Sequence, residues 1–362
     1  MKDPFPIPPI PFVSEFVRPW ADYFSLQTLP LHIHQIVLTA TFYHFIGRVV
    51  SPALSRRLFP TQYSSLSKGK RLNWDVHVVS LVQSTAINVL ALGVMFFDDE
   101  RRQMDWQERI WGYDGASAMI QSLAAGYFLW DLIITASNLN IFGLGMLAHA
   151  ISALLVYSFG FRPFVNYYSC NFILWELSSP FLNIHWFFDK LGMTGSAPQL
   201  YNGIALIVTF FSCRLVWGTY QSFLVARDIW TGLHNKPTVF ATVAPHDLSN
   251  ATFPPQYAQT MQFVTNSTGI PWWLAAVYIG SNLTLNSLNF YWFVKMIDAV
   301  RKRFDPSKKE AQNKKKDPLV EINADEPKHV TTGADGAVTE LKARPRRGTL
   351  LDGEETETPP PI

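Results

Sequence analysis

The chain contains 362 residues, of which 48% are hydrophobic, and its formal net charge is +2. Its apolar segments are long enough to cross a lipid bilayer, which excludes an ordinary pair of soluble domains. The small net charge identifies no partner, because acidic and basic residues are segregated along the chain. We therefore predict an all-α fold, a polytopic membrane bundle of about seven transmembrane helices with a disordered C-terminal tail.

The N-terminal part of the chain is proline-rich, and we expect residues 1–28 to form an extended segment. Residues 29–70 are predicted to form the first transmembrane helix and a basic connector. His32 and His34 in this helix are expected at the membrane interface. The connector is rich in arginine and lysine and poor in acidic residues, which places it in the cytoplasm by the positive-inside rule.

Further apolar stretches predict the remaining spans, at residues 77–97, 115–135, 141–161, 165–187, 201–226 and 271–297. The connector before the last span carries glycosylation sequons at Asn250 and Asn266, which are usable only on the lumenal side. Because the first connector is cytoplasmic, the N-terminus before the first span lies in the lumen. Six further crossings then bring the C-terminus back to the cytoplasm. Residues 301–362 begin with a basic run, as a cytoplasmic tail should, and their charged, aromatic-poor composition predicts disorder.

Three ionisable residues lie inside consecutive apolar stretches: Asp131, His149 and Glu176. Placing a charge at bilayer depth costs roughly 2.5 to 3.5 kcal/mol on insertion scales, so these side chains should face the bundle interior or a wet cavity. Any one of these residues could simply form hydrogen bonds that hold neighbouring helices together. Three of them on consecutive spans favour a functional site.

Other polar residues are expected to line the same interior. Pro180 has no N–H, so we expect a kink that leaves the carbonyl of Glu176 free. Arg214 is always charged and needs a buried carboxylate, for which Glu176 and Asp131 are both available. The complete set of predicted cavity residues is His77, Glu176, Asn183, Arg214, Asn282, Asn286 and Asn289.

Four sequence motifs resemble those of the TLC-domain family. They begin at Asn73-Trp74-Asp75, Gly126-Tyr127-Phe128, Glu176-Leu177-Ser178 and Leu288-Asn289-Phe290. The resemblance covers most of the folded chain and implies a TLC domain at residues 71–300. This domain is shared by ceramide synthases and the translocating-chain-associated membrane protein, and the subgroup that looks nearest is the one assigned to lipid homeostasis. The resemblance implies a multi-pass protein of the endoplasmic-reticulum membrane.

The resemblance leaves two functions open. In ceramide synthases it implies acyl transfer from acyl-coenzyme A by adjacent histidines, whereas the matching pair here is Ala148-His149. The first hypothesis is therefore a protein that binds or senses a lipid within its bundle and contributes to membrane lipid homeostasis, with no cofactor and no metal. The second is an acyltransferase in which His149 acts as the base and Asp131 orients it, with acyl-coenzyme A as co-substrate. Membrane lipids are the expected partners, nucleic acid is not, and a homo-oligomer remains open.

Overall fold

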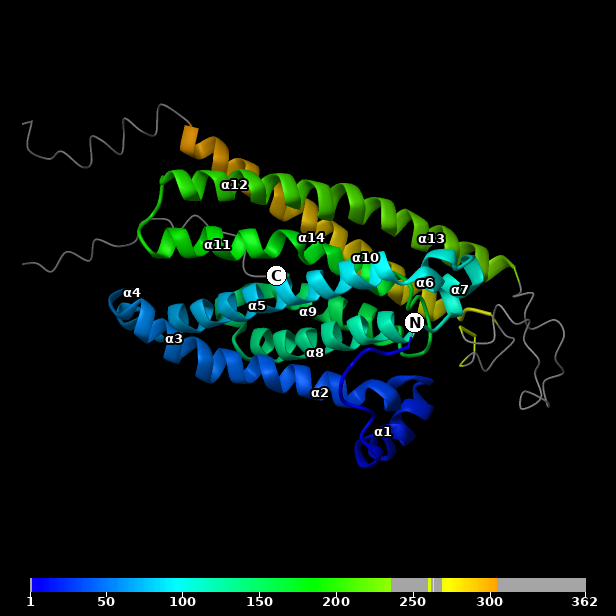
Figure 1. The fold of residues 1–362 in the computed structure, drawn as a ribbon. Helices are drawn as coiled ribbons and strands as arrows, with labels where there is room; N and C mark the ends of the chain where they lie inside the picture. Colours follow the sequence, from blue (N-terminus) through cyan, green and yellow to red (C-terminus); the bar gives the residue numbers. More distant parts are fainter. Residues whose placement is uncertain (1, 236–259, 262, 264–268, 305–362) are drawn as a thin grey trace, which may run out of the picture. The chain divides into compact units, whose positions relative to one another are not determined.

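The computed structural model describes residues 2–235, 260–261, 263 and 269–304. Every regular element in these residues is helical, which confirms the predicted all-α class (Figure 1). Packing separates a unit that runs from Met1 to Phe293 from a second that begins at Val294. The tail predicted to be disordered from residue 301 begins later than expected, because residues 301–304 continue α14 (Trp272–Phe304). The rest of that tail and the sequons at Asn250 and Asn266 lie outside the described residues.

We had expected the N-terminal segment to be extended throughout. Part of it is instead a helix, α1 (Pro11–Tyr23). Pro11 occupies the first turn of α1, where its missing N–H costs no hydrogen bond. Helix α1 packs against α2 (Leu29–Phe45). A helix with a partner surface available is favoured over extended chain despite its prolines.

His32 and His34 do not lie at an exposed interface, because both are buried. The His32 Nε2 atom is 2.9 Å from the hydroxyl of Tyr113. The His34 Nε2 atom donates a hydrogen bond to the carbonyl of Ile7 at 2.9 Å. The Nδ1 atom of His32 is also 3.5 Å from the carboxylate of Asp3, so the segment before α1 supplies a polar partner to each of these two rings.

The basic connector is also more helical than expected. Helix α2 continues into the π-helical turn η1 (Ile46–Val50) and then into α3 (Ser51–Leu58) and α4 (Pro60–Ser65). Prolines begin or nearly begin both short helices, which is the position a helix tolerates best. Helix α5 (Lys68–Phe97) follows directly.

Four helical segments in the described part of the chain are long and apolar enough to cross a membrane. They are α5, α7 (Trp106–Trp111) with α8 (Gly115–Ser137), α9 (Leu139–Phe159), and the segment Ala197–His234. The short α6 (Asp99–Gln103) lies between α5 and α7. The expected count of seven spans is thus not confirmed. Helix α2, where the first span was expected, has only 17 residues.

The expected fifth span is broken into three pieces: α10 (Tyr168–Ile173), the 3₁₀ turn η2 (Leu174–Ser178) and α11 (Ser179–Lys190). Pro180 lies in the first turn of α11. We had expected the carbonyl of Glu176 to be free. Instead, it accepts a hydrogen bond from the backbone N–H of Ser179. The tighter 3₁₀ turn supplies a donor three residues on, so the chain bends without an orphaned carbonyl.

Helix α8 lies at the centre of the first unit, packed against α2, α5, α9 and α10 (Figure 1). A side chain at Gly126 would place its Cβ 2.6 Å from the carbonyl of Ile36, so glycine is what lets α8 approach α2. Helix α11 packs against α5 and against α12 (Ala197–Phe210), and α13 (Gly218–His234) packs against α7 and α10. The last described helix is α14 (Trp272–Phe304).

Candidate functional site

Two distorted helical turns meet in the interior of the bundle. One is η2, and the other is the π-helical turn η3 (Phe211–Trp217), which joins α12 to α13. Gly218 follows η3, and a Cβ there would collide with the indole nitrogen of Trp175 in η2. Glycine therefore allows the two turns to touch, and π-helical turns often occur at functional sites.

Arg214 lies in the middle of η3 and is 1% exposed. Its Nε atom donates to the hydroxyl of Ser178 at 2.9 Å, and its Nη2 atom donates to the hydroxyl of Ser179 at 3.0 Å. Its Nη1 atom donates to the side-chain carbonyl of Asn289 at 3.0 Å. The guanidinium is thus held in one orientation by three neutral acceptors.

Glu176 supplies the opposite charge. Its Oε1 atom is 3.9 Å from Nη2 of Arg214, and the carboxylate is buried. Of the two carboxylates that the sequence offered to Arg214, the structure selects Glu176. A buried ion pair is stabilising only when hydrogen bonds satisfy its remaining atoms. Each nitrogen of the Arg214 guanidinium has such a bond, whereas the Oε2 atom of Glu176 has none among the described residues.

A cavity opens beside this ion pair, with about 410 Å³ of empty space including its opening. Glu176, Arg214, His149 and Asn282 form its polar side. The remaining wall is apolar and aromatic and comes from α8, α9, α10, η2 and α14: Phe128, Ala153, Val156, Tyr157, Phe172, Ile173, Trp175 and Leu285. A polar end and an apolar wall are what an amphiphilic ligand requires.

Two polar atoms of this cavity lack partners. Neither the Oε2 atom of Glu176 nor the Nδ1 atom of His149 has a hydrogen-bond partner within the described residues, although both atoms are buried. The imidazole is held by ring contacts instead, at 6.2 Å from Phe128 and 5.7 Å from Trp292 between centroids. Leaving a buried polar atom unpaired costs about 1 to 3 kcal/mol, so two such atoms in one cavity point to a ligand or water there.

Asp131 is buried but is not part of the cavity wall. Its Oδ1 atom accepts a long hydrogen bond of 3.5 Å from Thr135, and its Oδ2 atom has no partner among the described residues. Tyr127, one turn earlier in α8, stacks its ring on that of Trp130 with the centroids 6.0 Å apart. The structure thus brings His149 to Glu176 and Arg214 around one space, and leaves Asp131 outside it.

His77 and Asn183 form a separate network between α5 and α11. The Nδ1 atom of His77 is 2.8 Å from the side-chain oxygen of Asn183, and the imidazole stacks on Trp186 at 3.9 Å. The amide nitrogen of Asn183 donates to the hydroxyl of Ser80 at 3.0 Å and to the carbonyl of Ser179 at 2.8 Å. The polar side chains of this network are hydrogen-bonded to one another, which indicates that they hold α5 and α11 together rather than bind a ligand.

The three amides of α14 have different surroundings. Asn289 binds Arg214, and Asn282 lies on the cavity wall. Asn286 donates to the hydroxyl of Ser222 at 2.9 Å and to the side chain of Asn282 at 3.0 Å. It therefore links α14 to α13 and fixes the amide that faces the cavity.

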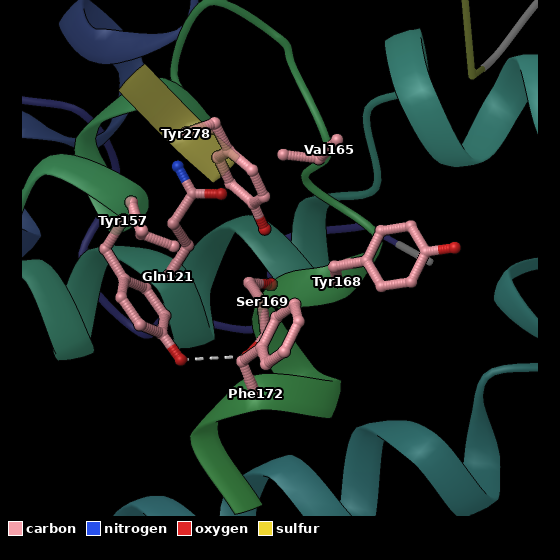
Figure 2. A pocket seen from close by; sticks show the side chains of 9 residues that line it. Gln121, Tyr157, Val165, Tyr168, Ser169, Phe172 and Tyr278 are labelled. Atoms are coloured by element: carbon pink, nitrogen blue, oxygen red, sulfur yellow. Dashed lines mark hydrogen bonds between the residues drawn. The ribbon is translucent and has the colours of Figure 1, made fainter. Parts of the chain in front are cut away.

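A second cavity, with about 220 Å³ of empty space including its opening, adjoins the first and shares Val156, Tyr157 and Phe172 with it. Gln121 and Tyr278 also line it, and Figure 2 shows Gln121 beside Tyr157. The Nε2 atom of Gln121 has no partner in the described chain, while its Oε1 atom accepts from Asn166 at 2.7 Å. The two cavities therefore lie next to each other at the apolar wall of the first, away from its polar side.

One group of carboxylates outside the cavity has the spacing of metal ligands: the oxygens of Asp98, Glu100 and Asp114 lie within 4.8 Å of one another. Two of these residues have another role. Asp98 caps α6 by accepting from the N–H of Arg101, and Asp114 caps α8 by accepting from the N–H of Ser117. Helix capping explains these acidic residues at the ends of α6 and α8.

Sequence reasoning missed the two serines that hold Arg214. Ser178 and Ser179 were available from the Glu176 motif, where they stand between the carboxylate and Pro180. Their placement depends on the 3₁₀ turn, which no periodicity in the sequence indicates. The π turn at Arg214 was missed for the same reason.

Comparison with known proteins agrees with the motifs. A family model of the TLC domain matches residues 73–298. An uncharacterised TLC domain-containing protein of Schizosaccharomyces pombe is 40% identical over 297 residues, which cover 82% of this chain and 88% of that protein. Topoisomerase I damage affected protein 4 of Saccharomyces cerevisiae is 27% identical over 289 residues, covering 78% of this chain and 89% of that protein. TLC domain-containing protein 4 of Homo sapiens is 31% identical over 156 residues, or 42% of this chain and 58% of that protein. The chain belongs to the TLC-domain family, as its sequence motifs predicted.

Proposed function

We propose that this protein binds or senses a lipid inside its helical bundle and contributes in this way to membrane lipid homeostasis. The observation that carries the proposal is the cavity in which buried, unpaired atoms of Glu176 and His149 lie beside Arg214 and face an apolar wall. A lipid has both parts that this cavity could satisfy, a polar group and an acyl chain.

The polar groups of the cavity indicate the chemistry of the lipid's head. Arg214 is already engaged by Ser178, Ser179 and Asn289, so its charge is balanced by Glu176 rather than offered to an anion. The free positions are a carboxylate oxygen and an imidazole nitrogen. A neutral head with hydroxyl or amide donors fits them better than a phosphate.

The acyltransferase alternative has less support. It requires Asp131 to orient His149. The ring of His149 instead packs against Phe128 and Trp292, and Asp131 accepts a hydrogen bond from Thr135. A general base is usually held by the group that orients it. Turnover by His149 would therefore need a different partner, for which Glu176 on the same cavity wall is the candidate.

We further propose that the protein lies in the endoplasmic-reticulum membrane with a lumenal N-terminus and a cytoplasmic C-terminus. Beyond the four candidate spans, α2 with η1, the broken segment from α10 to α11, and α14 supply the other crossings that this topology needs. Helix α2 contains 17 residues and η1 contains 5. At 1.5 Å per residue, the two together are long enough to cross about 30 Å of hydrocarbon. The basic connector and basic tail support the orientation.

The test compares two matched substitutions of a buried carboxylate by its amide. Glu176→Gln changes the cavity wall, and Asp131→Asn makes the same chemical change outside it. Lipid that co-purifies with the full chain is measured by native mass spectrometry. The wild type and Asp131→Asn should retain one specific lipid, and Glu176→Gln should retain several-fold less. Absence of any specific lipid from the wild type, or equal loss in both variants, would reject the proposal.

A further inference from the structure

Helix α1 is held to the rest of the protein by one of its faces. The hydroxyl of Ser14 donates to the carbonyl of Pro30 at the start of α2 with a length of 2.6 Å. Ala21 on the same face is 1% exposed, and its carbonyl accepts the N–H of Leu26 at 2.7 Å. This face is therefore packed, and it fixes how the rest of α1 is presented.

A second face of α1 is aromatic and uncovered. Its residues follow one another at helical spacing and are exposed by 79%, 72%, 62% and 80%: Phe12, Phe16, Trp20 and Tyr23. Large aromatic side chains gathered on one exposed face mark an interaction surface rather than ordinary exposure.

The charged residues of α1 occupy a third sector. Glu15, Arg18 and Asp22 are all exposed. At about 100° per residue they fall together, in the sector between the packed face and the aromatic one. The helix thus separates its aromatic side chains from its charges, although neither group is needed for packing against α2.

The position of α1 links this face to the membrane. Both the N–H and the hydroxyl of Thr28, between α1 and α2, donate to the carbonyl of Phe161, at 3.0 and 3.1 Å. Phe161 comes just after the end of α9, which is a candidate span. In addition, Arg162 donates to the carbonyl of Phe24 at 3.3 Å. The junction of α1 and α2 is therefore tied to the end of a span, where the chain meets the headgroup region.

We propose that α1 is an interfacial helix, which lies along the membrane surface with its aromatic face in the boundary between headgroups and acyl chains. Aromatic side chains concentrate at that depth because they combine an apolar ring with polar edges. The charged sector would face the headgroups and water. The occupant of the aromatic face is thus the bilayer itself.

The proposal is tested by spin labels on the full chain reconstituted into lipid nanodiscs. A nitroxide is attached at Phe16→Cys or Phe12→Cys on the aromatic face, and at Arg18→Cys on the charged sector as the matched control. Cys170 and Cys213 are buried, so the unsubstituted chain gives the labelling background. Power saturation then measures collision with oxygen, which enters the bilayer, and with a water-soluble nickel chelate.

Labels at positions 16 and 12 should show an oxygen-to-nickel collision ratio several-fold higher than the label at position 18. Equal ratios at the three positions would show that the aromatic face is in water and would overturn the proposal. Protection of positions 16 and 12 from both reagents would overturn it as well, since the face would then be covered by protein. Dipolar broadening at these positions would identify that protein as a second copy.

Discussion

Arg214 and Glu176 form a buried ion pair, with Nη2 and Oε1 separated by 3.9 Å, in which every guanidinium nitrogen donates a hydrogen bond but one carboxylate oxygen has no partner among the described residues. Ser178, Ser179 and Asn289 hold the guanidinium, while Oε2 of the carboxylate faces the cavity without a partner among the described residues. This asymmetry distinguishes a ligand site from a purely structural pair, because a structural pair would gain from satisfying both ions.

Replacing Arg214 by Met should destabilise the protein by about 3 to 5 kcal/mol, because Glu176 would remain as a buried charge without its partner. Arg214→Lys should also destabilise, since an ammonium cannot reach three acceptors in the planar geometry of a guanidinium. The free energy of unfolding is measured in mixed detergent micelles. Adding Glu176→Gln to Arg214→Met should restore part of the loss, and no restoration would contradict coupling between the two residues.

Removal of the Asn183 side chain should cost about 1 to 3 kcal/mol, because the ring of His77 and the hydroxyl of Ser80 would lose a buried partner. The lipid content of the remaining folded protein should not change, since Asn183 is not part of the cavity wall. Unfolding and native mass spectrometry of Asn183→Ala measure the two effects. Loss of lipid from folded Asn183→Ala would show that this network belongs to the binding site.

The sequence predicted the helical class and most cavity residues because both follow from hydropathy and from the cost of charges in lipid. Of the residues expected in the interior, Glu176, Arg214, His149 and Asn282 line one cavity, and Asn289 accepts a hydrogen bond from Arg214. His77 and Asn183 form a network of their own, and Asn286 binds Ser222 and Asn282. Asp131 is buried but is not among the residues that line this cavity.

The remaining differences have a local cause. The 3₁₀ turn before Pro180 and the π turn around Arg214 depend on contacts between η2 and η3, and such contacts leave no periodic signal in either segment. The helix α1 escaped prediction because its prolines suggested extended chain, whereas its stability comes from packing on α2.

Stability should depend on pH through Asp98. Burial, together with the nearby carboxylate of Asp114, raises the pKa of Asp98 above its usual value. The folded protein then keeps a proton that the unfolded chain has released. The free energy of unfolding therefore falls as pH rises from the unfolded pKa, about 4, through the higher folded pKa.

Asp98→Asn should flatten this dependence, because it removes the ionisation and keeps an acceptor for the N–H of Arg101. Glu15→Gln, at an exposed carboxylate on α1 outside this acidic group, is the matched control and should leave the slope unchanged. Thermal unfolding at a series of pH values measures both. A slope in Asp98→Asn equal to that of the wild type would exclude Asp98 as its source.

The proposed orientation predicts that the sequons at Asn250 and Asn266 are glycosylated in cells, since both then face the lumen. Endoglycosidase H should increase the mobility of the wild type on a gel. The double variant Asn250→Gln with Asn266→Gln should run at the digested position and show no further shift. A tag at the C-terminus should be open to protease in intact microsomes, and protection of that tag would reverse the orientation.

The central claim, lipid binding without turnover, is tested most directly by lipid analysis of cells that lack the protein and are complemented with wild type, His149→Ala or Asp131→Asn. We predict that Asp131→Asn restores the lipid profile as the wild type does, whereas His149→Ala restores it only in part, because only His149 contacts the cavity. If a lipid product disappears with His149→Ala, whether or not Asp131→Asn also removes it, the protein is an enzyme and the account is contradicted. Full restoration by His149→Ala would contradict it too, since the cavity would then have no part in the function.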